Sequence, residues 1–286
     1  MAALQKIRLY LGMIKFAHSV FALPFAFTSA LLAAGGMPPL GKVLWIAVAM
    51  VGARSGAMGL NRVIDMDIDA ENTRTNMREL PAGKISKPSA LGFSLVSLGV
   101  MVYAAYVLNP LCLKLSPLAI AVLLAYSYAK RFTWGAHFIL GIALAFAPLG
   151  AWVAIRGTLD AQALPLTMAV LLWLPGFDIL YALQDMDFDR RSKLFSIPAR
   201  FGVRASLYIA RALHLCSWAL LVANGFIFGL GPVYFIGMAA VAGLFIYEHS
   251  LVHEHDLSKL NMAFFNMNGY ISVSVFVFTT LDFMAH

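Results

Sequence analysis

The sequence predicts an all-α protein that crosses a membrane several times, with its helices in a bundle around a central cavity. Of its 286 residues, 61% are hydrophobic and 12% are charged, whereas an ordinary soluble domain has about 25% charged residues. Apolar runs of about 20 residues, the length that crosses the hydrocarbon core, recur along the chain. Eight of the fourteen acidic residues gather in two short clusters. We expect these clusters to be functional, because unpaired carboxylates in so apolar a chain cost free energy.

Nine apolar runs, separated by charges, by proline and glycine or by polar loops, are predicted to span the bilayer. The first run follows Lys6, Arg8 and Lys15, as the apolar core of a signal peptide would follow basic residues. It is long for such a core, and another span follows at once. We therefore expect that it is not cleaved and forms the first transmembrane helix. The breaks between spans fall, in order, at Pro38-Pro39, the loop 61–87, Asn109-Pro110, Lys130-Arg131, Arg156-Gly157, the loop 185–204, Gly231-Pro232 and Lys259. The predicted spans are 16–36, 40–60, 88–108, 111–129, 135–155, 163–184, 205–228, 232–252 and 261–282.

Nine spans place the two termini on opposite sides of the membrane. Most lysines and arginines fall on the N-terminal side, while the opposite side holds Lys42, Lys114 and Arg156. The positive-inside rule therefore puts the N-terminus and both acidic clusters on the cytoplasmic side of the cell's inner membrane. These loop residues explain the net charge of +7, so we exclude nucleic acid as a partner. The two cysteines exclude a disulfide scaffold, and the sequence does not indicate an oligomeric state.

Both acidic clusters place carboxylates at positions i and i+4, which stack on one face of a helix. The clusters read Asn61-Arg-Val-Ile-Asp65-Met-Asp67-Ile-Asp69 and Asp185-Met-Asp187-Phe-Asp189. Carboxylates so placed repel each other, and a bound cation between them would offset this repulsion. Mg²⁺ prefers one or two carboxylates and completes its shell with water and phosphate oxygens. The spacing therefore predicts two carboxylate pairs that hold a diphosphate through bridging Mg²⁺. The alternative is that both clusters are solvated loop acids balanced by nearby arginines, namely Arg74, Arg78, Arg190 and Arg191.

Two charged residues inside predicted spans align with these clusters. Asp178 precedes Asp185 by seven residues and Arg54 precedes Asn61 by seven, so each lies on the face of its cluster and two turns deeper. We expect them to line one polar cavity, although each could instead pair with another helix. Asp65 and Asp185 stand 120 positions apart, each before a basic loop, which is consistent with two related halves.

Several segments resemble the UbiA-type intramembrane prenyltransferase family, in particular its 4-hydroxybenzoate polyprenyltransferase branch. The residues 61–83 are similar to the family's NxxxDxxxD signature with its R-x-L-P-x-G continuation, and Tyr-Ala-Leu-Gln-Asp185-Met-Asp-Phe-Asp189 resembles the second DxxxD. The segment Tyr126-Ser-Tyr-Ala-Lys130-Arg131-Phe-Thr is similar to the YxxxK stretch, and 263–270 resembles the tail of that branch. The likeness extends from the first predicted helix to the last.

The resemblance implies that residues 1–286 form a single intramembrane domain with Mg²⁺ as cofactor and a polyprenyl diphosphate and an aromatic acid as substrates. It implies that Asp65, Asp69, Asp185 and Asp189 hold the metal, with Asn61 beside them. Tyr126 and Lys130 would contact the diphosphate, and Arg131 a phosphate or the acid's carboxylate. We add Arg54 and Asp178 as substrate-binding residues, and Asp185 as the residue that accepts the proton, beside Lys130 and Arg131 in catalysis. Asp67 and Asp187 lie outside the motif spacing and are expected either to stand behind the metal ligands without touching the metal or to be solvated.

The acceptor stays open between two aromatic acids. Arg62 stands where many 4-hydroxybenzoate enzymes have Asp, and the second motif continues unlike the best-known branch. We expect 4-hydroxybenzoate, in ubiquinone biosynthesis; the alternative is a naphthoate-type acid in menaquinone biosynthesis. A CDP-alcohol phosphotransferase is disfavoured because its D-G-x-x-A-R run is absent. A membrane cation transporter is disfavoured because the acids gather at one end of the spans rather than throughout them.

Overall fold

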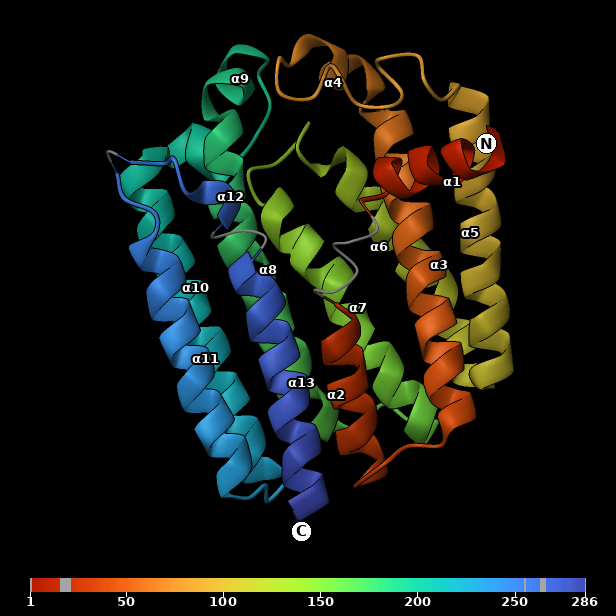
Figure 1. Ribbon diagram of the computed structural model, residues 1–286, viewed down its shortest axis with the longest axis vertical. Helices are drawn as coiled ribbons and strands as arrows, with labels where there is room; N and C mark the ends of the chain where they lie inside the picture. The colour runs from red at the N-terminus through yellow and green to blue at the C-terminus, as the bar shows by residue number, and fades with distance from the viewer. Residues whose placement is uncertain (1, 16–21, 255, 263–265, 286) are drawn as a thin grey trace.

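The computed structural model describes residues 2–15, 22–254, 256–262 and 266–285, and these residues form helices and loops with no β-strand. The long helices run side by side, while the short helices α4 (Met66–Glu71) and α9 (Met186–Arg191) cap one end of the bundle (Figure 1). The remaining helices are α1 (Ala2–Met13), α2 (Leu23–Ala34), α3 (Leu40–Ile64), α5 (Lys87–Leu108), α6 (Pro110–Ala129), α7 (Ala136–Arg156), α8 (Leu164–Ala182), α10 (Ile197–Ile227), α11 (Pro232–Ser250), α12 (Leu260–Met262) and α13 (Asn268–Ala285).

The all-α, multi-pass fold is confirmed, but the count of nine spans is not. Among the described residues, seven helical segments are long and apolar enough to cross a membrane: α3, α5, α6, α7, α8 with its extension through α9, α10 and α11. The first predicted span corresponds to α2, which has only 12 residues, and 16–21 lie outside the described residues. The last corresponds to α13, which is not among the seven. The seventh, predicted at 205–228, corresponds to the part of α10 that follows a kink at Gly202, where φ 79° and ψ 178° are not helical. Before this kink, Ser196 caps the start of α10 by accepting a hydrogen bond from the backbone N–H of Ala199.

The long helices form a closed ring. Each packs against the next in the order α2, α3, α5, α6, α7, α8, α10, α11 and α13, and α13 returns to α2. Helix α1 lies at the end of the bundle that α4 and α9 cap, and the C-terminus lies at the opposite end (Figure 1). Both acidic clusters are therefore at the end where α1 lies, as the alternation of spans predicts.

Glycines on one face of α3 direct its opposite face toward the interior. Gly52 lies so close to α5 that a Cβ there would be 2.8 Å from the carbonyl oxygen of Ser97, and a Cβ at Gly59 would overlap the hydroxyl of Ser94. Small residues permit this approach of two membrane helices. At 100° per residue, the face opposite Gly52 carries Arg54 and Asn61. Close packing on α5 thus presents these two polar side chains to the ring's interior.

Candidate functional site

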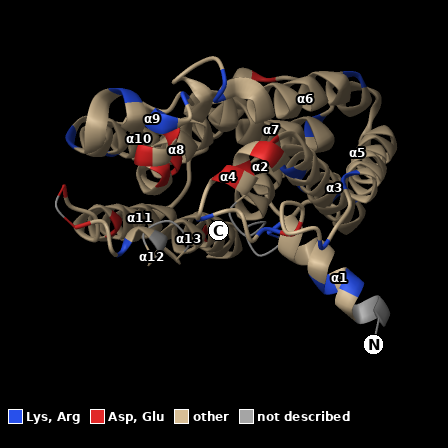
Figure 2. Ribbon diagram, turned by 90° about the horizontal axis from the view of Figure 1, so that it is seen from above, with Lys and Arg blue, Asp and Glu red and all other residues tan. Residues whose placement is uncertain are grey.

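A polar cavity of about 650 Å³ lies at the capped end of the ring. Viewed from above, the acidic residues of α4 and those at the junction of α8 and α9 lie on neighbouring parts of the ring (Figure 2). Nearly all of the predicted site residues line this cavity: Arg54, Asn61, Asp65, Asp69, Tyr126, Lys130, Asp178, Asp185 and Asp189. Arg131 is not among the lining residues. Sequence positions more than a hundred residues apart therefore meet in one site.

The helix breaks at the first aspartate of each motif in the same way. Asp65 ends α3 with φ −92° and ψ 4°, and Asp185 precedes α9 with φ −104° and ψ 3°. A helix of six residues follows each, Met66–Glu71 in one case and Met186–Arg191 in the other. The motifs are thus structural counterparts, which supports the two-halves interpretation and adds a turn that the i, i+4 spacing did not predict.

Asp65 is held by three neighbours. Asp65 is 2% exposed. The carboxylate accepts hydrogen bonds from Lys130 Nζ at 2.7 Å, from Arg131 Nη2 at 2.9 Å and from the Asn61 side-chain amide at 3.2 Å. The predicted stacking of Asn61 under Asp65 is therefore present. Arg131 also donates to the carbonyl oxygens of Ser127 and Ile64. In this arrangement Arg131 supports Asp65 from outside the cavity, whereas Lys130 reaches the same carboxylate from the cavity wall.

Asp69 points to a different pair of cations. Its carboxylate accepts from Arg78 Nη1 at 2.7 and 2.8 Å, and Arg62 lies 3.7 Å away. Asp69 is 4% exposed and Arg62 is also buried. Arg62 further donates to the carbonyl oxygen of Met13 at 3.4 Å, which attaches the end of α1 to the site. The Arg at position 62 therefore has a structural use as a counter-ion to the motif.

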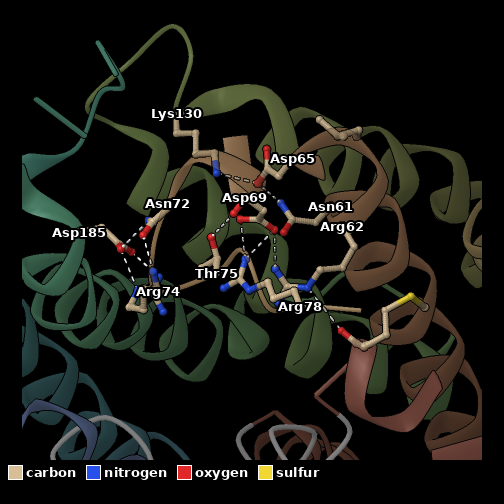
Figure 3. A network of polar contacts seen from close by, with 12 residues as sticks. Asn61, Arg62, Asp65, Asp69, Asn72, Arg74, Thr75, Arg78, Lys130 and Asp185 are labelled. Carbon is tan, nitrogen blue, oxygen red and sulfur yellow. Dashed lines mark hydrogen bonds and ion pairs between the residues drawn. The ribbon is translucent and has the colours of Figure 1, made fainter. Parts of the chain in front are cut away.

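Asp185 joins the two halves of the site (Figure 3). Arg74, from the loop after α4, donates through Nε and Nη2 to the two carboxylate oxygens, and Asn72 donates at 3.0 Å. The same arginine donates from Nη1 to the hydroxyl of Tyr181 at 2.8 Å. Burial lowers the pKa of Arg74, but hydrogen bonding to Asp185 and its charge raise that pKa above the ordinary value for arginine. Arg74 therefore keeps its positive charge at physiological pH.

Asp178 faces the cavity two turns deeper than Asp185 and pairs with a histidine. The backbone N–H of Ile197 donates to His137 Nε2 at 3.3 Å, which leaves the ring proton of neutral His137 on Nδ1. Nδ1 lies 2.6 Å from Asp178 Oδ2 and donates to it. Asp178 is thus an oriented carboxylate with no lysine or arginine beside it within the described residues. The predicted pairing of Asp178 with another helix and its predicted place on the cavity wall are both present.

Arg54 is the one arginine of the cavity wall that has no hydrogen-bond or ion-pair partner in the described part of the chain, since Arg62, Arg74 and Arg78 each contact a carboxylate. Its Nε is buried and lacks an acceptor. Tyr126, within electrostatic range of both Arg54 and Asp178, lines the same wall. A guanidinium whose Nε is buried without an acceptor costs free energy, so its presence at the cavity wall indicates a ligand that brings an anion.

The other acidic residues of the motifs differ in exposure. Asp67 and Asp187 are exposed, as expected for residues outside the motif spacing. Asp189 lines the cavity, forms a hydrogen bond with Ser196, and takes part in no ion pair among the described residues. Of the four predicted metal ligands, Asp65, Asp69 and Asp185 therefore carry cationic partners and Asp189 does not.

The chemistry of these side chains fits Mg²⁺. All four carboxylates face one cavity, and oxygen is the ligand that Mg²⁺ prefers. The described residues contain no cluster of three His, Cys, Asp or Glu side chains that would cage a metal. Mg²⁺ is usually held by one or two carboxylates together with substrate phosphates, so separate carboxylates around a wide cavity suit a metal that arrives with a diphosphate. Lys130, Arg74 and Arg78 now neutralise carboxylates and would be free to contact phosphate oxygens once a divalent ion replaced them.

The predicted site did not include three of the residues that hold the motif carboxylates. Asn72, Arg74 and Arg78 lie in the loop 72–86, where no periodicity indicates which side chains point inward. The alternative interpretation did name Arg74 and Arg78 as counter-ions, and the structure shows both in that role, while Arg190 donates to a backbone carbonyl instead. His137, which orients Asp178, gave no sequence signal because its partners are 41 and 60 residues away.

Several known proteins are similar to this chain in sequence and in fold. A 4-hydroxybenzoate octaprenyltransferase of Vibrio atlanticus is 30% identical over 249 residues, which is 87% of each chain. One of Pseudomonas fluorescens is 32% identical over 252 residues, 88% of this chain and 84% of the other. The apo structure of a UbiA homolog from Aeropyrum pernix K1 has a TM-score of 0.81 at 31% identity, covering 94% of this chain and 97% of that one. A UbiA homolog from Archaeoglobus fulgidus bound to DMAPP and Mg²⁺ has a TM-score of 0.70 at 18% identity, covering 97% and 99% of the two chains, and supports the fold.

The family model for the UbiA prenyltransferase family matches residues 22–270. This range contains both acidic motifs, the Tyr126–Lys130 segment and every residue whose contacts are described above, except the α1 end. Because this family model covers most of the chain and relatives are 30% identical or more, the chain belongs to the UbiA prenyltransferase family.

Proposed function

We propose that this chain transfers a polyprenyl group from a polyprenyl diphosphate to an aromatic acid, with Mg²⁺ as cofactor. The observation that supports this most directly is the pair of matching aspartate turns at one polar cavity, with Arg54 unpaired beneath them. The turns suit a Mg²⁺-bound diphosphate, and the guanidinium suits a carboxylate. We also keep the interpretation of residues 1–286 as one domain, with the cavity facing the cytoplasm at the inner membrane.

The residues around the two aspartate turns bind and orient the diphosphate. Asp65, Asp69, Asp185 and Asp189 would hold Mg²⁺, which supplies charge neutralisation for the departing diphosphate. Lys130 and Tyr126 contact the diphosphate from the cavity wall, and Arg74 and Arg78 join them when they leave their carboxylates. Arg131 acts as a positioning residue through Asp65, because its guanidinium is already committed to Asp65 and two carbonyls.

The acceptor lies deeper, where Arg54 binds its carboxylate. The allylic C–O bond of the donor breaks and its electron pair leaves with the diphosphate, which gives an allylic cation sheltered from water. A ring carbon of the acceptor forms the new C–C bond, and the ring then loses a proton. We assign that proton to Asp178 and not to Asp185 as the sequence suggested, because Asp185 would hold Mg²⁺ in the complex, whereas Asp178 has no lysine or arginine beside it among the described residues.

The relatives named 4-hydroxybenzoate octaprenyltransferase support 4-hydroxybenzoate as the acceptor, and with it a step of ubiquinone biosynthesis. To test this, purified protein with Mg²⁺ is given a radiolabelled polyprenyl diphosphate and either 4-hydroxybenzoate or a hydroxynaphthoate. We expect label in the benzoate product. Label in the naphthoate product alone would replace the acceptor with the menaquinone alternative, and label in neither would refute transfer to an aromatic acid.

A further inference from the structure

An arginine of the membrane-spanning helix α10 faces away from the bundle. Arg211 is exposed on the outside of that helix, whereas Arg54 of α3 faces the polar cavity. Among the described residues Arg211 has no hydrogen-bond or ion-pair partner, and its guanidinium lies over the ring of Tyr208, 5.7 Å from the ring centroid. Charged side chains on the lipid-facing side of a membrane helix are rare and indicate a function. The proposed reaction does not use this arginine.

Arg211 belongs to a row of exposed side chains on one face of α10. The opposite face of the helix is buried against α8, where Ser217 donates to the carbonyl oxygen of Ala169 at 2.8 Å. Residues at i, i+4, i+7 and i+11 share a face of a helix. The row, which we call the outer stripe, consists of Arg204, Tyr208, Arg211 and Leu215, all of them exposed.

The level of Arg211 is the edge of the hydrocarbon core at the capped end. The 19 residues of α11 are about 28 Å long, close to the core's thickness of about 30 Å. His249, near the end of α11, lies 3.0 Å from His214 of α10, which places this edge near His214. Counted along α10 from Ile227, at the opposite end, about 30 Å of helix reaches Tyr208. Arg211 lies between these two levels, where lipid headgroups begin.

The guanidinium of Arg211 is directed toward the capped end, because Tyr208, whose ring it covers, lies one turn closer to that end. An arginine at the edge of a bilayer directs its charge toward the headgroups in this way. Arg204 lies beyond Tyr208 on the same face, about 10 Å from Arg211 along the helix axis. Both long side chains can therefore reach one phosphate group placed over the tyrosine between them.

Carboxylates do not neutralise this surface in the described part of the chain. Helix α10 contains no Asp or Glu, and the acidic residue of α11, Glu248, is buried and accepts from Asn268. Arg204 likewise has no hydrogen-bond or ion-pair partner among the described residues. Helix α11 packs beside α10, and its His249 is within electrostatic range of Arg211 (Figure 1). Two unpaired cations beside a seam between membrane helices suit an anionic headgroup.

We propose that the outer stripe binds the phosphate of an anionic phospholipid. Arg204 and Arg211 donate to the phosphate oxygens over the ring of Tyr208, and an acyl chain extends along Leu215 toward the opposite end of the bundle. This site is separate from the proposed function and does not depend on it, because no residue of the outer stripe lines the polar cavity.

The test uses full-length protein purified in a non-ionic detergent, with dissociation constants obtained from ligand-induced thermal stabilisation. The ligands are phosphatidylglycerol, which is anionic, phosphatidylcholine, whose phosphate is balanced by its own cation, and inorganic phosphate. The wild type is compared with Arg204→Gln and Arg211→Gln. The matched control is Lys114→Gln, which removes one exposed cation from α6 at the opposite end of the bundle.

The wild type and Lys114→Gln should bind phosphatidylglycerol alike, and more tightly than phosphatidylcholine. Each arginine variant should bind phosphatidylglycerol about fivefold more weakly, the contribution of one arginine at an anionic membrane surface, with little change for phosphatidylcholine. Both arginines are exposed and lack polar partners among the described residues, so the variants should fold; if one does not, the other decides.

Binding of phosphatidylglycerol as in wild type by the folded arginine variants would overturn the proposal. Equal binding of the two lipids by the wild type would also overturn it, as would an equal loss in Lys114→Gln, since binding would then follow total charge alone. Inorganic phosphate should not displace phosphatidylglycerol at equal concentration. Displacement would assign the two arginines to free phosphate and overturn the lipid assignment.

Discussion

Replacing Arg54 with glutamine should weaken binding of the acceptor and leave binding of the donor unchanged. Arg54 is the guanidinium of the polar cavity whose buried Nε has no acceptor, and it lies below the aspartate turns. In the proposed complex it donates to the acceptor's carboxylate, and a hydrogen bond to a charged group contributes about 1.5–3 kcal/mol. Loss of one such bond raises the KM for the acceptor about 10- to 150-fold.

The assay measures initial rates against acceptor concentration for two acceptors, 4-hydroxybenzoate and its methyl ester. The ester lacks the carboxylate, so in the wild type it should be the poorer substrate, and Arg54→Gln should treat acid and ester nearly alike. Arg54→Lys keeps the charge without the planar fork and should fall between the two. The reasoning is refuted if Arg54→Gln slows both acceptors equally, or if only the KM for the donor rises.

Three further predictions concern the groups around the site. Arg74→Gln should raise the KM for the donor about tenfold or more in the rate assay, because a charge-assisted contact to the diphosphate is lost. The control is Arg190→Gln, which should match wild type in the same assay, because Arg190 is exposed and donates to a backbone carbonyl. His137→Ala should lower kcat about tenfold or more with little change in the KM for the donor, because Asp178 loses its orienting N–H; an unchanged kcat would contradict this. Gly52→Ala should lower the free energy of unfolding by about 1 kcal/mol or more, because its methyl meets the α5 backbone, and Gly92→Ala, which meets open space, should not; thermal unfolding compares them.

Much of the site could be predicted from the sequence because helical spacing determines which residues share a face of a helix. Arg54 and Asn61 are seven residues apart on α3, and Asp178 and Asp185 are seven apart at the end of α8, so periodicity alone predicts a shared face. The structure places all of them on one cavity wall. Charge asymmetry and the alternation of spans likewise predicted that both motifs lie at the end where α1 lies.

The rest depends on contacts that no local pattern encodes. Asn72 reaches Asp185 across 113 residues of sequence, from a loop without periodicity. The direction of Arg131, away from the cavity and toward Asp65, follows from how α6 meets α3, which spacing does not show. The described part of the first predicted span is α2, which begins at Leu23, and apolar composition predicts membrane residence without fixing where a helix begins.

The central claim is that the motif aspartates act through Mg²⁺ on a prenyl diphosphate. The most direct measurement is prenyl transfer by purified protein in which Asp65→Asn is compared with Asp67→Asn, its exposed neighbour two positions on, each with Mg²⁺ and with excess EDTA. Asp67→Asn should retain wild-type, EDTA-sensitive turnover, and Asp65→Asn should fold with an unchanged circular dichroism spectrum yet lose turnover. Full activity of Asp65→Asn, or wild-type turnover in EDTA, would contradict it.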